Sequence, residues 1–162
     1  KTQGIIVLNL YVPNGAEVNS EKYHYKLEWF SKLHPFIKHL QSEKDHVIIL
    51  GDFNIAPEDQ DVHAPEEWKG CNLVSQAERN ELNKILAYGF SDCFRSFNQP
   101  DKSFSWWDYR AAGFKRNRGL RIDLILASNS LTKRCSLSYI DTEPRKLVRP
   151  SDHTPVIAVF DL

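Results

Sequence analysis

Residues His46–Asn54 read HVIILGDFN and carry the clearest signal of secondary structure in the chain. Four consecutive apolar residues, 47–50, are typical of a strand that is buried on both faces. The strand runs directly into Gly51 and Asp52, a pair that is common where a chain turns. A strand buried on both faces needs other layers of structure above and below it, so this stretch favours an α/β fold.

Further strands and two helices are predicted on either side. Residues 20–42 carry apolar side chains at three- and four-residue spacing, which indicates an amphipathic helix that Pro35 kinks or splits in two. The capping box SQAE at 75–78 begins a second helix, which ends at Gly89. Apolar runs predict further strands at 4–12, 103–107, 122–127, 136–140 and 156–160. Because strands and helices do not alternate strictly, we expect an α/β protein with a mixed β-sandwich flanked by helices.

Composition places the chain among ordinary globular proteins. It has 162 residues, of which 41% are hydrophobic and 26% are charged, so disorder is excluded as its main state. It has no apolar run of about 18 residues, so we expect no membrane as a partner. The formal net charge is zero, and any affinity for nucleic acid must therefore be local. Cys71, Cys93 and Cys135 are widely spaced, so we interpret them as reduced core thiols of a cytoplasmic protein.

Polar residues stand beside three of the predicted strands. Asp52 and Asn54 follow the strand at 46–50, Asp123 lies within LRIDLIL, and Asp152 and His153 precede the last strand in RPSDHTPV. Side chains at strand ends in α/β proteins converge at one edge of the sheet, where sites form. Each group alone is also compatible with ordinary turn chemistry.

Asp123 is the most informative of these residues. A carboxylate between apolar neighbours must find a partner or lose much of its solvation energy. His153 is the natural partner, since an Asp–His pair fixes the orientation of the imidazole and leaves its second nitrogen free for chemistry. The other five histidines lie in or beside helix and loop segments, and we interpret them as packed or solvated.

Five motifs in order resemble the bacterial exonuclease III branch of the endonuclease/exonuclease/phosphatase superfamily. They are NLYVPNG, GDFNIAPEDQDV, SFSWWDYR, NRGLRIDLILAS and PSDHTPV, and the resemblance runs from Ile5 to Phe160. GDFN and SDH alone would also fit neutral sphingomyelinases, inositol polyphosphate phosphatases and DNase I-like nucleases. NLYVPNG and NRGLRIDLIL narrow the resemblance to abasic-site endonucleases.

The resemblance implies a DNase I-like four-layer fold, of which residues 1–162 would be the C-terminal portion of a single domain. Family members have an upstream segment with an Asn and a Glu that contribute to a divalent-metal site. Neither is present here, and the chain contains no methionine. We therefore expect these residues alone to cleave DNA poorly or not at all.

The activity that the resemblance implies is metal-dependent hydrolysis of the phosphodiester 5′ to an abasic site in double-stranded DNA. Action at 3′ ends would follow as 3′–5′ exonuclease and 3′-phosphatase activity, carried out by a monomer. Asp52 would lie next to the attacking water or the leaving oxygen, and Asn54 and Tyr11 would hydrogen-bond the phosphate. Asp123 would orient His153, which acts either as a charged donor or as the base.

Metal and substrate contacts are implied in the same way. Asp152 would be the retained ligand of Mg²⁺ or Mn²⁺. Asn14 would lie close to the DNA backbone, and an apolar pocket for the flipped-out, base-less sugar would be formed by Trp106, Leu120 and Ile122. Five basic residues with no acid among them would grip the phosphates, namely Arg110, Lys115, Arg116, Arg118 and Arg121.

The sequence leaves alternatives open both for single features and for the function. The tryptophans are also compatible with core packing, and the basic stretch is also compatible with a solvated loop. A phosphodiesterase of the same fold that acts on a lipid or inositol phosphate would share GDFN and SDH. A truncated, non-catalytic fragment that binds DNA weakly would show the same motifs.

Overall fold

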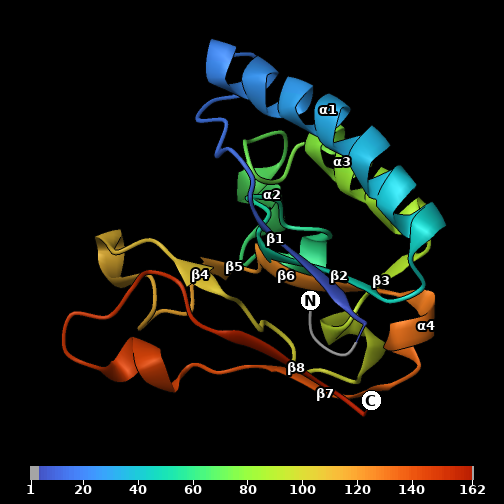
Figure 1. The fold of residues 1–162 in the computed structure, drawn as a ribbon. Coiled ribbons are helices and arrows are strands. Elements are labelled where there is room, and N and C mark those ends of the chain that lie inside the picture. Colours follow the sequence, from blue (N-terminus) through green and yellow to red (C-terminus); the bar gives the residue numbers. More distant parts are fainter. Residues whose placement is uncertain (1–3, 162) are drawn as a thin grey trace.

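A four-stranded mixed sheet forms the centre of the protein in a computed structural model that describes residues 4–161. Its strand order is β1 (Ile6–Tyr11), β2 (Val47–Asp52), β6 (Asp123–Ser128) and β3 (Phe90–Asp92). Strands β1 and β2 are parallel, whereas β6 runs antiparallel to both β2 and β3 (Figure 1). The predicted buried strand at 46–50 is therefore central, with partners on both sides.

Two long helices cover one face of this sheet. Helix α1 (Glu21–Glu43) begins at Ser20, whose hydroxyl accepts a hydrogen bond from the amide of Tyr23. Helix α3 (Gln76–Ala87) begins with the predicted capping box, and Gly89 follows its end with a φ of +98°. Their apolar stripes pack on the sheet around residues such as Phe30, Ile49 and Leu82. The prediction that Pro35 splits the first helix is wrong, because α1 continues through it.

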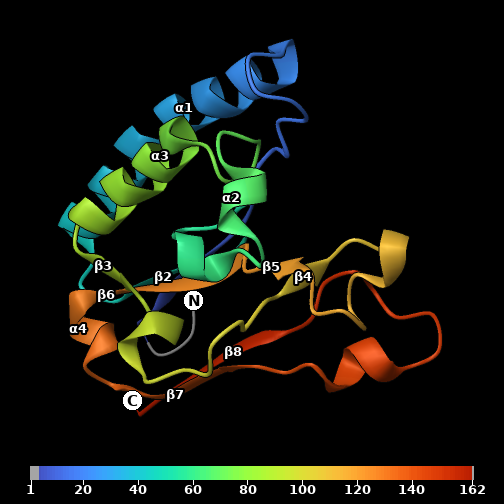
Figure 2. The same ribbon diagram turned by 180° about the vertical axis from the view of Figure 1, so that it is seen from behind.

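A two-stranded ribbon covers the opposite face (Figure 2). Strands β7 (Cys135–Ile140) and β8 (Val156–Phe160) pair antiparallel. Ala158 and Phe160 pack against a buried cluster that includes Ile48 and Ala127. Helices, central sheet and ribbon therefore form three layers, and the predicted α/β fold with sheets flanked by helices is confirmed.

A second small ribbon stands beside the end of the sheet. It consists of β4 (Trp106–Trp107) and β5 (Gly119–Leu120), so the strand predicted at 103–107 is shorter than expected. Trp106 also forms an isolated bridge with His153, which fastens the ribbon to the chain just before β8. Short helical segments complete the fold: α2 (Pro65–Trp68), α4 (Asn129–Thr132), and 3₁₀ turns at Asp59–Asp61, Phe94–Ser96, Arg110–Ala112 and Glu143–Lys146.

The three cysteines are free thiols with different surroundings. Cys93 is buried, Cys135 is half-buried and Cys71 is exposed. The interpretation of all three as core thiols is therefore wrong for Cys71, which lies in the loop after α2 rather than in an apolar layer. None of the helices in the described residues combines the length and the apolar character needed to cross a membrane.

Candidate active site

Three polar residues lie side by side at one edge of the central sheet. In the strand register, Tyr11 at the end of β1 pairs with Asp52 at the end of β2, and Asp52 pairs in turn with Asp123 at the start of β6. The sheet therefore places two carboxylates directly opposite each other on neighbouring strands. Like charges in such positions repel each other, so this arrangement costs stability.

Asp52 and Asn54 form a rigid turn at the end of β2. Both carboxylate oxygens of Asp52 accept from Asn54, one from its backbone N–H at 2.8 Å and one from its side-chain amide at 3.1 Å. The same amide donates to the carbonyl of Val12 at 2.9 Å, and its oxygen accepts from Asn14 at 3.0 Å. These bonds hold Asn54 at a φ of +49°, a left-handed conformation that is uncommon for residues other than glycine.

Asp123 and His153 are paired, as expected from the sequence. The Oδ2 atom of Asp123 lies 2.8 Å from Nδ1 of His153. The buried Ser105 hydroxyl donates to the same oxygen at 2.7 Å and accepts from the backbone N–H groups of Ile122 and Asp123 at 3.0 Å each. Because Nδ1–H of His153 donates to Asp123, the second ring nitrogen of His153 is left for other partners.

The surroundings of Asp52 and of His153 change the proton affinity of both groups. Burial raises the pKa of Asp52 to about 6, and the negative charge of Asp123 adds to this effect. Burial alone would lower the pKa of His153, but the hydrogen bond and charge of Asp123 outweigh it, so the pKa is raised. The site therefore holds a carboxyl group that can exchange a proton near neutral pH beside an imidazole that favours its charged form.

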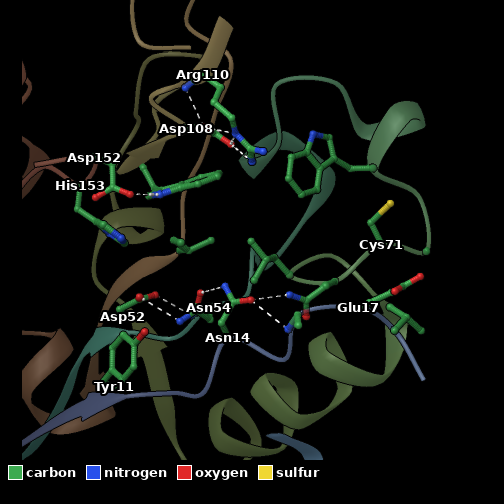
Figure 3. A pocket seen from close by; sticks show the side chains of 18 residues that line it. Tyr11, Asn14, Glu17, Asp52, Asn54, Cys71, Asp108, Arg110, Asp152 and His153 are labelled. Carbon is green, nitrogen blue, oxygen red and sulfur yellow. Dashed lines mark hydrogen bonds and ion pairs between the residues drawn. The ribbon is translucent and has the colours of Figure 1, made fainter. Parts of the chain in front are cut away.

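A pocket of about 920 Å³ opens at this edge of the sheet. Figure 3 shows Asp152 and His153 on one side of it and Asp52, Asn54 and Asn14 on another. The remaining wall comes from the loop after α2. Nine of the candidate site residues from the sequence line this pocket, namely Tyr11, Asn14, Asp52, Asn54, Trp106, Arg110, Ile122, Asp152 and His153.

The apolar part of the pocket is smaller than predicted. Trp106 is half-buried, and its indole N–H donates to Oδ2 of Asp152 at 3.0 Å. Ile122 lines the pocket although only 2% of it is exposed. Leu120 was expected here but does not line the pocket. It pairs with Trp106 across the small ribbon, and its side chain is fully buried in the cluster behind that residue.

Fewer of the basic residues than predicted are free to contact DNA phosphates. Arg121 is fully buried and pairs with Asp61 at 2.7 Å and with Asp92 at 2.7 Å, so it is a structural residue. Arg118 is half-buried and pairs with Glu67 at 3.0 Å. Arg110 pairs with Asp108 and lines the pocket beside it. Among the described residues, Arg116 is exposed and has no ion pair, as is the case for Lys115.

The residues present do not form a metal centre on their own. Within residues 4–161 no group of three or more His, Cys, Asp or Glu side chains lies close enough together to hold an ion. Asp152 already accepts a hydrogen bond from Trp106 through one carboxylate oxygen. Asp152 as a ligand of Mg²⁺ or Mn²⁺ therefore stays a prediction.

Two supporting residues were not predicted from the sequence. Ser105 gives no local signal, because its role depends on the approach of β6. Lys26 does give one, since it lies three residues after Tyr23 and four before Phe30, on the apolar stripe of α1. A lysine at such a position must be buried with partners, and its ammonium indeed lies beneath the turn that carries Asn54.

A mixed sheet covered by helices, with two carboxylates, a histidine and two asparagines at one edge, defines the DNase I-like class of α/β proteins. Over residues 2–153 the sequence matches the endonuclease/exonuclease/phosphatase family, and the chain belongs to that family.

Relatives of this chain include exonuclease III enzymes and abasic-site endonucleases. Exodeoxyribonuclease III of Haemophilus influenzae is 34% identical over 96% of this chain, which spans 61% of that protein. A 3′ phosphatase from Neisseria, solved with a product DNA hairpin, superposes with a TM-score of 0.96 at 39% identity and covers 99% of this chain. An AP endonuclease from Archaeoglobus fulgidus superposes with a TM-score of 0.92 at 38% identity, again over 99% of this chain. The chain spans 62% and 63% of these two structures.

Proposed function

We propose that the protein hydrolyses the phosphodiester on the 5′ side of abasic sites in double-stranded DNA and also acts at 3′ ends. The observation that carries this proposal is the pocket in which Asp52 faces the Asp123–His153 pair beside Trp106. The names of the relatives support it, since they include an AP endonuclease and a 3′ phosphatase bound to a DNA product.

Asp52 is the group proposed to take the proton of the attacking water. Its pKa of about 6 leaves it mostly ionised at pH 7, yet close enough to that pH to accept a proton during the reaction. The amide of Asn54 keeps the carboxylate oriented, and its neighbour Asn14 holds the amide in place.

His153 is proposed to act as the cationic donor. Its raised pKa favours the protonated imidazole, which donates to a non-bridging phosphate oxygen as negative charge develops there. Asp123 stabilises that cation and fixes the ring, while Ser105 fixes Asp123. Tyr11, which is 72% exposed and pairs with Asp52 in the strand register, is proposed to hydrogen-bond the same phosphate.

A direct test is incision of a duplex that contains one abasic site, in the presence of Mg²⁺. We expect a polypeptide that also carries the upstream Asn and Glu implied by the family resemblance to cleave on the 5′ side of the site, with little endonucleolytic cleavage of the same duplex without the lesion. Residues 1–162 alone are expected to cleave the abasic duplex poorly or not at all. Sphingomyelin and an inositol polyphosphate serve as competing substrates. Hydrolysis of either one, with the abasic duplex left intact, would favour the phosphodiesterase alternative and overturn the proposal.

Trp106→Ala is expected to weaken selection of the abasic site by about tenfold to a hundredfold, because it removes an indole ring from the lining of the pocket. Binding to undamaged duplex and its salt dependence should stay nearly unchanged. Trp106→Phe is the control, since it keeps an aromatic ring at this position and removes the N–H bonded to Asp152.

Arg116→Gln gives the opposite pattern in the same titration of affinity against salt. This exposed cation should bind phosphate, so the affinity for both duplexes should fall by the same factor. The slope of log binding constant against log salt concentration should become shallower by about one. Equal weakening of both duplexes by Trp106→Ala, with an altered slope, would contradict this division between apolar and ionic contacts.

A further inference from the structure

Lys26 and Glu78 form an ion pair in which both side chains are fully buried. Lys26 comes from the first part of α1, and Glu78 is the third residue of α3. Removal of two charges from water is expensive, and apolar residues of similar size often stabilise a protein as well or better. Stability alone is therefore a poor explanation for this pair.

The ammonium group of Lys26 uses its three protons on three different segments. It donates to the backbone carbonyl of Asn54 at 2.7 Å, to that of Asn14 at 3.2 Å, and to Oε1 of Glu78. Both asparagines line the pocket, and their side chains are hydrogen-bonded to each other (Figure 3). Lys26 therefore joins the two loops through their backbone carbonyls, and the side chains of the two asparagines join the same loops at the pocket.

Glu78 is equally saturated with donors. Its oxygens accept from the backbone N–H groups of Leu73 and Ser75 at 3.1 Å each and from the hydroxyl of Ser75 at 2.6 Å. Leu73 belongs to the pocket wall after α2 and has a φ of +71°. The ion pair therefore connects three walls of the pocket, and each wall contains a residue in a left-handed backbone conformation, namely Ala16, Asn54 and Leu73.

We propose that the Lys26–Glu78 pair is a positioning device for this site, which sets the Asn14–Asn54 contact and, through Asn54, the orientation of Asp52. The effect of this pair on catalysis rests on the proposed function, whereas its contacts with the pocket residues do not. Lys26 touches no reacting atom in this scheme and is a positioning residue rather than a catalytic one.

Asp52 also responds to the charge of this pair. It faces Asp123 on β6, His153 before β8 and Lys26 on α1, with Tyr11 beside it on β1. The positive charge of Lys26 is one of the influences that lower the pKa of Asp52. Removal of either partner of the ion pair should therefore change Asp52, and in opposite directions.

The experiment compares Lys26→Met, Glu78→Gln and Lys26→Arg by NMR titration of the Asp52 carboxyl carbon and by steady-state cleavage of abasic duplex. Lys26→Met should raise the pKa of Asp52, because it removes a nearby positive charge. Glu78→Gln should lower the pKa of Asp52, because the cation then lacks its counter-charge. Both should reduce kcat about 10- to 100-fold with little change in KM, since misplaced groups slow the chemical step. Lys26→Arg keeps the charge and should restore the pKa.

Glu81→Gln is the matched control. It removes a second ion pair between the same two helices, that of Glu81 with His34 at 2.7 Å, which contacts neither asparagine. It should lower the melting temperature without changing kcat or the pKa of Asp52. An unchanged pKa of Asp52 in both Lys26→Met and Glu78→Gln, or kcat values equal to that of Glu81→Gln, would overturn the inference.

The titration needs no substrate. Failure of a wild-type polypeptide that includes the upstream metal ligands to cleave abasic DNA would therefore contradict the proposed function and leave the positioning role separately testable. If Lys26→Met does not fold, Glu78→Gln and Lys26→Arg still give different expectations for the pKa of Asp52, which should be lowered in the first variant and unchanged in the second.

Discussion

Replacement of His153 by alanine is expected to reduce kcat for cleavage of abasic DNA by about 10²- to 10⁴-fold, the usual range for a positioned acid–base group. The imidazole is held by Asp123 at 2.8 Å, and only 31% of its side chain is exposed. Its charge is therefore available to the phosphate at close range in a partly dry pocket. Single-turnover cleavage by the wild type and the variant measures this effect.

Binding should be affected far less than turnover, because the proposed donor acts mainly when charge builds on the phosphate. Asp123→Asn is the matched control. It keeps the shape of the pair but removes the negative charge that favours the imidazolium, so it should lose most of the same activity. A near-normal kcat in His153→Ala would contradict the assigned role, as would a loss confined to KM.

Replacement of Asp52 by asparagine is expected to abolish most turnover and to stabilise the protein at neutral pH. The pKa of Asp52 is about 6 in the folded protein, against an ordinary value of 3.8. Between these two pH values the folded state keeps a proton that the unfolded state has released, so stability falls as pH rises through this window. The loss is complete at pH 7 and amounts to about 3 kcal/mol.

Asparagine at position 52 cannot ionise and therefore avoids this loss. Its amide nitrogen no longer accepts one of the two hydrogen bonds from Asn54, which costs about 1 kcal/mol, so we expect a net gain of about 2 kcal/mol at pH 7. Urea unfolding at pH 7 and at pH 4 measures the difference between variant and wild type. The gain should shrink or vanish at pH 4, and a gain of equal size at both pH values would contradict the ionisation argument.

The main elements of the fold could be predicted from the sequence where local pattern and environment agree. The buried run at 47–50 and the capping box at Ser75–Glu78 specify their structures locally, and both are present. Pro35 does not split α1 in two, because the packing of α1 on the sheet outweighs one missing backbone hydrogen bond. Strands β3 and β5 were missed since each has two or three residues, too few to show a period.

The site was predicted in part for a similar reason. Asp123 gave a strong signal because a carboxylate in an apolar run needs a partner, and its partner is His153. Arg121 gave a misleading signal, since a run of basic residues says nothing about acids elsewhere in the chain. Its partners Asp61 and Asp92 come from two distant segments, and only the fold brings them together. The roles assigned to the pocket residues stay predictions.

The bridge between Trp106 and His153 also bears on how the protein folds. It joins the small ribbon to the segment before β8, and Asp123, between them in sequence, pairs with the same histidine. Contacts between segments so far apart form only after the entropy of closing long loops has been lost, and such contacts are associated with slow folding. The local turns of α1 and α3 need no such closure. A refolding chain should therefore form its helices early and its pocket in the last steps. Molecules with native helical content but without a formed pocket should precede the native protein.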